Sequence, residues 1–154
     1  MKIEQQIKTS SQLPPSRRLL ISLLYTANLI NDQIGEALKP FDISIPQFNV
    51  LRILRGQKGK PANLSTIQDR MVSKMSNTTR LVDKLILKEL VERVICEKNR
   101  RKVEISITQK GMNLLTRIDP VVDSAEKAIT NNLSTDEMEK MTELLQQLHY
   151  SEED

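Results

Sequence analysis

The sequence has very few of the residues from which metal centres, disulfide frameworks and many catalytic sites are built. Among its 154 residues there are one cysteine, Cys96, one histidine, His149, and four glycines. A single cysteine forms no internal disulfide, and one histidine beside it provides no nitrogen and sulfur cluster for zinc. No glycine-rich turn or nucleophile elbow accompanies His149. We therefore predict a protein without a metal, a cofactor or enzymatic activity.

Long apolar runs are absent as well. No stretch of about 18 apolar residues occurs, and the opening MKIEQQIKTSSQ has no apolar segment followed by a small-residue cleavage site. We therefore expect a soluble, cytoplasmic protein with no membrane partner, and a single cysteine fits a reducing compartment. The length and the 38% hydrophobic content suit one ordinary domain with its own core.

The formal net charge of +3 conceals an uneven distribution along the chain. Residues 43–108 contain 14 Lys and Arg against 6 Asp and Glu, a net charge of +8, whereas the remainder carries −5. A strongly basic middle segment indicates a polyanionic partner, and nucleic acid and an anionic membrane surface both meet that description. The arrangement of the charges along the predicted elements decides between nucleic acid and a membrane surface.

Amphipathic helices are predicted on both sides of the basic segment. One starts near Pro14 and ends near Lys39, a second follows Thr108 with a kink expected at Pro120, and the last begins at a capping box formed by Ser134 and Glu137. The apolar seams repeat at spacings of three and four residues. They comprise Leu20, Leu23, Ala27, Ile30, Ile34 and Ala37 in the first helix, Leu115, Ile118, Val122, Ala125 and Ile129 in the second, and Met138, Met141, Leu145 and Leu148 in the last.

Two interpretations of these seams remain open. The helices can form a bundle within one chain, or they can pack against their copies in a homodimer. The first helix is distant in sequence from the other two, and only a small middle domain is available to cover their apolar surface. These features favour the homodimer, with Leu20, Leu23, Ile30, Ile34, Met138, Met141, Leu145 and Leu148 in the interface.

The basic middle segment is predicted to contain a helix-turn-helix. A helix over 45–55 is followed by the loop GQKGKPAN and by a short helix capped by Ser65 with Gln68. In the next helix, the apolar positions of SKMSNTTRLVDKLILKEL face the core at Thr78, Leu81, Val82 and Leu85. The opposite face then presents Lys74, Ser76, Asn77, Arg80 and Lys84. Polar and cationic residues near the N-terminus of such a helix suit the major groove, where asparagine pairs with adenine and arginine with guanine.

A basic β-hairpin is predicted after this helix. Val91 and Ile95 alternate with charged residues in VERVIC, and Val103, Ile105 and Ile107 alternate in VEISIT, so one face of each strand is expected to be buried. The tip carries Lys98, Asn99, Arg100, Arg101 and Lys102. Clustered like charges repel one another, so a polyanion that compensates them is the simplest explanation. A basic hairpin after a helix-turn-helix is typical of a winged helix.

In order and spacing, these pieces resemble the MarR family of bacterial transcriptional regulators. The matching stretches are ISIPQFNVLRIL, NLSTIQDRM, SNTTRLVDKLILKELVER and EKNRRKVEISITQKG, between the long first helix and two C-terminal helices. The resemblance implies a mainly α fold with a small β-hairpin wing, in which residues 14–151 form one unit. Residues 41–108 would be the winged helix-turn-helix lobe, 14–40 and 109–151 the helical dimerisation region, and 1–13 an N-terminal extension.

The resemblance also implies a function. Such proteins are homodimers that bind pseudo-palindromic double-stranded DNA, usually as repressors, and many release it when a small aromatic or phenolic effector enters a cleft. Ser76, Asn77 and Arg80 match the recognition-helix positions, and Arg100 and Arg101 match the wing arginines. Thr108 and Gly111 match the residues that open the helix after the wing.

Two positions depart from the family pattern. Asn99 replaces the aspartate that commonly precedes the wing arginines, which leaves the order of the wing in question. Glu89 replaces the glycine that commonly ends the recognition helix, so a left-handed conformation there would cost about 1 kcal/mol.

Some alternatives also stay open. Cys96 is either a redox-active thiol or an ordinary small residue of a strand. The basic face binds either an operator or, in a different class of function, an acidic protein partner or RNA.

Overall fold

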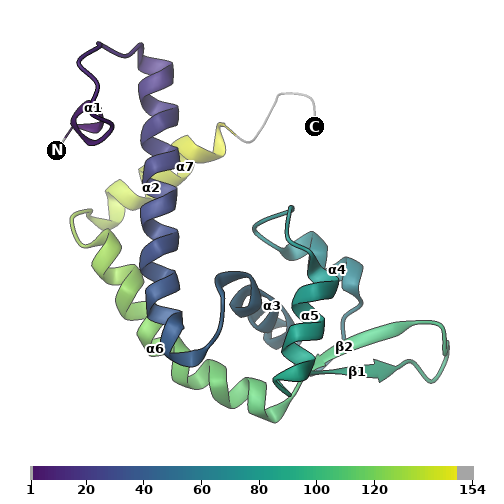
Figure 1. Ribbon diagram of the computed structural model, residues 1–154. Helices are drawn as coiled ribbons and strands as arrows, with labels where there is room; N and C mark the ends of the chain where they lie inside the picture. The colour runs from purple at the N-terminus through teal and green to yellow at the C-terminus, as the bar shows by residue number, and fades with distance from the viewer. Residues whose placement is uncertain (1, 149–154) are drawn as a thin grey trace.

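The computed structural model describes residues 2–148, so His149 and the end of the predicted 109–151 region lie outside the described residues. The predicted helices and strands follow one another along the chain in the expected order, and two short helices, one at the start and one after the first long helix, are additional (Figure 1). They are α1 (Ile3–Gln6), α2 (Pro15–Leu38), the 3-10 helix η1 (Lys39–Phe41), α3 (Ile45–Gly56), α4 (Leu64–Arg70), α5 (Thr78–Leu87), β1 (Val91–Ile95), β2 (Val103–Ile107), α6 (Gln109–Thr130) and α7 (Thr135–Gln146).

The chain is arranged as a helical arm and a smaller lobe. Long helices α2 and α6 pack against each other in the arm, while α3, α4, α5 and the hairpin β1–β2 form the lobe (Figure 1). This mainly helical chain with one antiparallel hairpin is the fold class that the sequence predicts. No described helix is long and apolar enough to cross a membrane.

One continuous core joins the lobe to the lower part of the arm. The predicted inward faces of α3 and α5 are confirmed, since Phe48, Leu51 and Leu54 are buried, as are Val82 and Leu85. The arm contributes Leu38 at the end of α2 and Leu115, Ile118 and Val122 along α6. Because these arm residues share the core of the lobe, the two parts form a single packed unit.

Side-chain caps define where the short helices of the lobe begin. Ser44 and Gln47 form a capping box at α3, and Asn63 caps α4 by accepting from the N–H of Thr66 at 2.7 Å. The predicted cap at Ser65 is therefore wrong by two residues. Ser and Asn are both good caps, and the choice falls on Asn63 because its backbone is extended there while Ser65 is already helical.

The predicted capping box of α7 is confirmed. Ser134 accepts from the N–H of Glu137 at 3.3 Å, and the Glu137 carboxylate accepts from the N–H of Ser134 at 2.8 Å. The N–H of Ser134, and its hydroxyl at 3.0 Å, both donate to the Glu137 carboxylate and lower its pKa. In the preceding helix, α6, Pro120 has no N–H to donate to the turn before it. Figure 1 shows that the axis of α6 bends.

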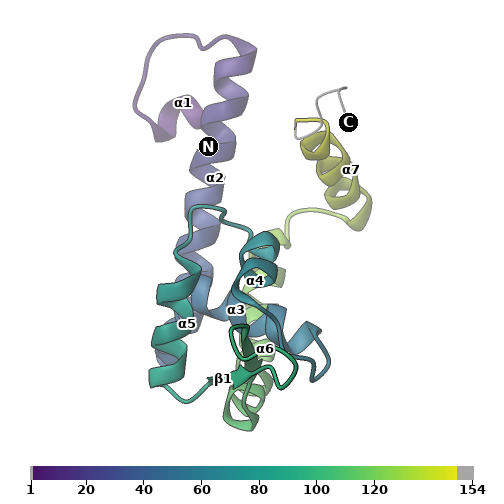
Figure 2. The ribbon, with the colours of Figure 1, turned by 90° about the vertical axis from the view of Figure 1, so that its right-hand side faces the viewer.

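The upper arm leaves much of its apolar surface uncovered. Helix α7 buries none of its residues, and Figure 2 shows it standing apart from α2. Along α2, Leu19, Leu20 and Leu24 are exposed, whereas α1 folds back onto the same helix through an ion pair of Glu4 with Arg18 at 3.0 Å. Within one chain, the helices of the arm therefore do not form the closed bundle that was one of the two interpretations.

The hairpin is buried only in the half nearest the lobe. Its register pairs Val91 with Ile107 and Ile95 with Val103. Val91 and Ile105 are buried, but Ile95 and Val103 are 69% and 46% exposed. The expectation of one fully buried face is wrong for the outer half, because the hairpin extends beyond the helices that would cover it (Figure 1). The loop before α4 contributes a short bridge between Ala62 and Ile105 that the sequence pattern did not indicate.

Helix α5 is followed by a strained residue. Glu89 has a φ of 59°, in the left-handed region, and the N–H of Leu90 donates to the carbonyl of Leu85 at 3.0 Å. This is a helix ending that usually has glycine, because a side chain at positive φ crowds its own backbone. The left-handed conformation raised as a possibility from the sequence is therefore present.

We predict that Glu89→Gly stabilises the fold by about 1 kcal/mol, because it removes the left-handed strain. The lost ion pair with Lys110 is exposed and contributes little. The measurement is the urea midpoint at fixed protomer concentration, with Glu89→Ala as the control that loses the carboxylate but keeps the strain. A midpoint for Glu89→Gly at or below that of Glu89→Ala would contradict the explanation.

Candidate nucleic-acid interface

The turn between α4 and α5 is held by a network centred on Gln68. The Gln68 amide donates to the carbonyl of Lys74 at 3.0 Å and accepts from the hydroxyl of Thr78. The Lys74 ammonium donates to the carbonyl of Asp69, and the N–H of Ser76 donates to the carbonyl of Ser73 at 3.2 Å. This turn therefore has a defined shape before any partner binds.

The predicted recognition residues lie partly on α5 and partly before it. Helix α5 begins at Thr78, so Lys74 and Ser76 belong to the turn, Asn77 is the N-cap, and only Arg80 and Lys84 lie on the exposed face of the helix. A hollow of about 360 Å³ brings four of the five together. We call it the recognition hollow, and it is lined by Pro46, Ser76, Asn77, Arg80, Leu81 and Lys84.

Asn77 has a structural task that the sequence interpretation missed. Its side-chain oxygen accepts from the N–H of Arg80 at 3.1 Å and caps α5. Paired hydrogen bonds to adenine need both the oxygen and the nitrogen of an asparagine amide. The predicted pairing with adenine is therefore disfavoured, because the oxygen is directed at the helix and the amide nitrogen is what remains for a partner.

The wing tip is a turn ordered by Asn99. The side-chain oxygen of Asn99 accepts from the N–H of Arg101 at 3.1 Å. The backbone carbonyl of Asn99 accepts from the N–H of Lys102 at 2.9 Å. The N–H of Asn99 donates to the carbonyl of Cys96 at 3.1 Å. An amide thus performs the turn-forming part of the role expected of an aspartate, and Cys96, half-buried, takes part through its backbone.

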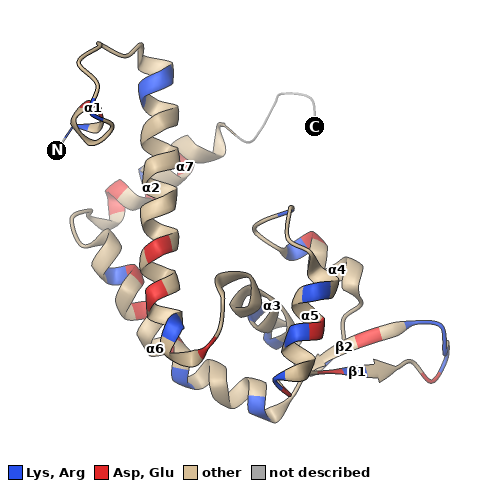
Figure 3. Ribbon diagram, in the orientation of Figure 1, with Lys and Arg blue, Asp and Glu red and all other residues tan. Residues whose placement is uncertain are grey.

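Most of the predicted interface cations have no anionic partner. Within residues 2–148, Lys102 pairs with Glu104 at 3.6 Å, whereas Arg80, Lys84, Lys98, Arg100 and Arg101 form no ion pair. Figure 3 shows the resulting positive charge at the hairpin tip and along α5, with much of the negative charge on the arm helices. These exposed cations are therefore available to a polyanion.

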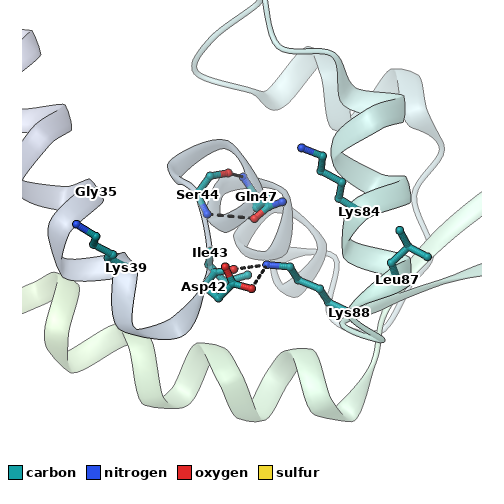
Figure 4. A pocket seen from close by; sticks show the side chains of 9 residues that line it. All are labelled: Gly35, Lys39, Asp42, Ile43, Ser44, Gln47, Lys84, Leu87 and Lys88. Atoms are coloured by element: carbon teal, nitrogen blue, oxygen red, sulfur yellow. Dashed lines mark hydrogen bonds and ion pairs between the residues drawn. The ribbon is translucent and has the colours of Figure 1, made fainter.

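A second hollow lies between the arm and the lobe. It measures about 580 Å³, and Figure 4 shows Lys84 and Lys88 extending toward it from α5 and its C-terminal end, whereas the Lys39 side chain points away from Asp42. We call it the cationic cleft, and it is lined by Gly35, Lys39, Asp42, Ile43, Ser44, Gln47, Lys84, Leu87 and Lys88. Lys84 also lines the recognition hollow, so one side chain belongs to both sites.

Two ion pairs brace the junction between the lobe and the arm, one within the lobe next to the segment that joins them and one across to α6. Neither was indicated by a local sequence pattern. Lys88 at the end of α5 contacts both the carbonyl and the carboxylate of Asp42, the latter at 2.9 Å. Arg55 of α3 forms a bidentate pair with Asp119 of α6, at 2.6 and 3.2 Å. Because the partners are 46 and 64 residues apart in sequence, only the tertiary structure reveals them.

The sequence of this chain is similar to known transcriptional regulators. A family model described as MarR family matches residues 43–103. The HTH-type transcriptional regulator MhqR of Bacillus subtilis is 31% identical over 133 residues, which cover 86% of this chain and 90% of MhqR.

Solved structures show the same fold. A mutant MarR from Escherichia coli complexed with operator DNA has a TM-score of 0.76 at 24% identity, over 90% of this chain and 99% of that one. BpsR of Bordetella bronchiseptica, whose DNA binding is regulated by 6-hydroxynicotinic acid, has a TM-score of 0.79 at 17% identity, over 92% of this chain and 100% of BpsR.

We predict that Asn99→Ala weakens DNA binding about fivefold, the value of one hydrogen bond of about 1 kcal/mol, because the N–H of Arg101 loses its acceptor and the wing must order on binding. Asn99→Asp keeps an acceptor and should retain most of the affinity. Fluorescence anisotropy on a labelled duplex measures both. Binding by Asn99→Ala that equals wild type would show that the side chain does not order the wing for DNA.

Proposed function

This chain is a member of the MarR family of DNA-binding transcriptional regulators, and from that premise we propose that it acts as a homodimeric, effector-responsive repressor on a pseudo-palindromic operator. The observation that carries the proposal is a set of cations that form no ion pair within residues 2–148 and lie on two separate elements. Arg80 and Lys84 line the preformed recognition hollow on α5, and the others are at the wing tip. Repression is the usual action of the family.

The homodimer is supported by the uncovered apolar surface of the arm. Of the eight predicted interface residues, Leu20, Ile30, Met141 and Leu148 are exposed in the single chain. Leu23, Met138 and Leu145 are only half-buried, and Ile34 packs against the core. Pairing α2 and α7 with their copies would bury this surface. The helical dimerisation region then comprises residues 14–40 and 109–151, around the lobe formed by residues 41–108.

The positions of the side chains indicate which residues would contact bases and which would contact phosphates. Ser76, Asn77 and Arg80 surround the recognition hollow at the N-terminal end of α5, the part of a recognition helix that meets base edges. Arg80 has the donors to read guanine, whereas the flexible wing cations meet phosphates or a minor groove. Lys74 is held at the turn and Lys84 lies a turn further along α5, where phosphates are the expected contacts.

The central test is selection of bound fragments from a random duplex pool by the intact protein. We expect a recurring pseudo-palindrome whose half-sites are about one helical turn apart, because two symmetric lobes must each reach the major groove. A single unpaired half-site would contradict the homodimer. Absence of any preferred duplex, together with binding to RNA or an acidic protein, would favour the alternative function.

Two matched arginine variants distinguish the contribution of the wing to DNA affinity from that of the recognition helix α5. Arg100→Ala should weaken binding to selected and random duplexes alike and reduce the salt slope by about 1, since a phosphate contact is lost. Arg80→Ala should cost about 1–3 kcal/mol on the selected site and little on random DNA. Equal effects of both variants on both duplexes would remove the distinction.

The cationic cleft is the site we propose for an effector. Lys88 pairs with Asp42, and Lys39 pairs with Glu36 outside the lining of the cleft. Lys84 forms no ion pair within residues 2–148, so the cleft suits an anionic form of the small aromatic or phenolic compound expected for the family. An anion held there would compete with DNA for Lys84 and with Asp42 for Lys88. Either change would disturb the position or charge of α5.

We predict that 6-hydroxynicotinic acid or a similar aromatic acid releases wild-type protein from the selected duplex and relieves repression in a promoter reporter. Lys39→Gln should require a higher concentration for release without changing DNA affinity in its absence, because Lys39 lines the edge of the cleft and does not line the recognition hollow. Anisotropy titrations provide the measurement. Identical release curves for wild type and Lys39→Gln would place the effector elsewhere.

A further inference from the structure

Two large apolar side chains project from the turn before the recognition helix. Met75 is 94% exposed and Val72 is 87% exposed, whereas Met71, at the start of the same turn, is 2% exposed in the core. A flexible turn would let such side chains fold onto the protein surface. This turn is instead anchored at its ends by Gln68 and Lys74, which leaves Met75 projecting at a defined place.

Met75 stands beside the polar groups that face DNA. It precedes Ser76, which lines the recognition hollow, and Asn77, which caps α5. Because the side-chain oxygen of Asn77 is engaged in the cap, the amide nitrogen of Asn77 and the guanidinium of Arg80 present donors only. In the major groove, donors match the acceptors of guanine and the O4 of thymine.

Thymine carries a second mark in that groove, its C5 methyl group, which only an apolar contact recognises. A donor at O4 together with an apolar side chain at the methyl would distinguish thymine from cytosine, which has a donor at that place and no methyl. The turn supplies both kinds of group on neighbouring residues. Exposed cations at Arg80 and Lys84 also make this surface unsuitable for an apolar protein partner and suitable for a polyanion.

We propose that Met75 is a specificity-determining residue that contacts the C5 methyl group of a thymine in each half-site, next to the base read by Arg80. The inference rests on the proposed operator binding. It adds that the turn before α5 recognises a thymine. Methionine suits the task because its unbranched, polarizable side chain adapts to a small apolar target.

The test removes single methyl groups from the selected duplex by replacing each thymine of one half-site with deoxyuridine. Wild type should lose about fourfold in affinity at one thymine, as burial of one methyl group predicts. Met75→Ala should bind the thymine and deoxyuridine duplexes equally. Met75→Leu, which restores an apolar side chain, should recover most of the difference.

Val121→Ala is the matched control, since it removes methyl groups from an exposed apolar side chain of α6, far along the chain from the turn. It should keep the full deoxyuridine effect. A duplex insensitive to every methyl removal, or an undiminished effect in Met75→Ala, would overturn the inference and leave operator binding intact. Failure to select any duplex would instead overturn the proposed function, and this inference with it.

Discussion

The backbone carbonyl of Leu90 is the point on which the geometry of the DNA-binding surface depends. It accepts from the N–H of Thr108 at 3.1 Å, and a Cβ built on Gly111 would lie only 2.3 Å from it. The hydroxyl of Thr108 donates to the carbonyl of Glu89 at 2.7 Å and also accepts from the N–H of Gly111. The end of α5, the start of β1 and the start of α6 therefore meet within a few ångströms.

This junction makes the recognition helix, the wing and the arm parts of one frame. A β-hairpin alone is barely stable, but here its inner residues Val91 and Ile105 lie in the core and its end is tied to α6. Ion pairs of Lys88 with Asp42 and of Arg55 with Asp119 reinforce the same frame from the arm side. A change in the arm can therefore be transmitted to α5 through these contacts, which is what the proposed effector response requires.

Periodicity predicted the inner faces of the lobe helices well, because there the apolar positions are covered by the core. The apolar spacing placed Thr78, Val82 and Leu85 on the inner face of α5, and all three are buried. It failed for Ile95 and Val103, because strand alternation states which residues share a face and not whether anything covers that face. The roles of the residues proposed to contact DNA stay predictions. Four of them line the recognition hollow, Lys74 lies in the turn before α5, and the remaining five form the separate wing tip.

The sequence by itself determined the order of elements, the helix-turn-helix followed by a basic hairpin, and the surplus of positive charge in the middle of the chain. Those features depend on local propensity, spacing and composition, which are read directly from neighbouring residues. Only the tertiary structure decided that Asn77 is a cap, that Asn99 orders the wing, and that Lys84 lies in both hollows. A side chain's hydrogen-bond partner depends on where the folded backbone directs it, and several residue types can occupy the same place in a local pattern.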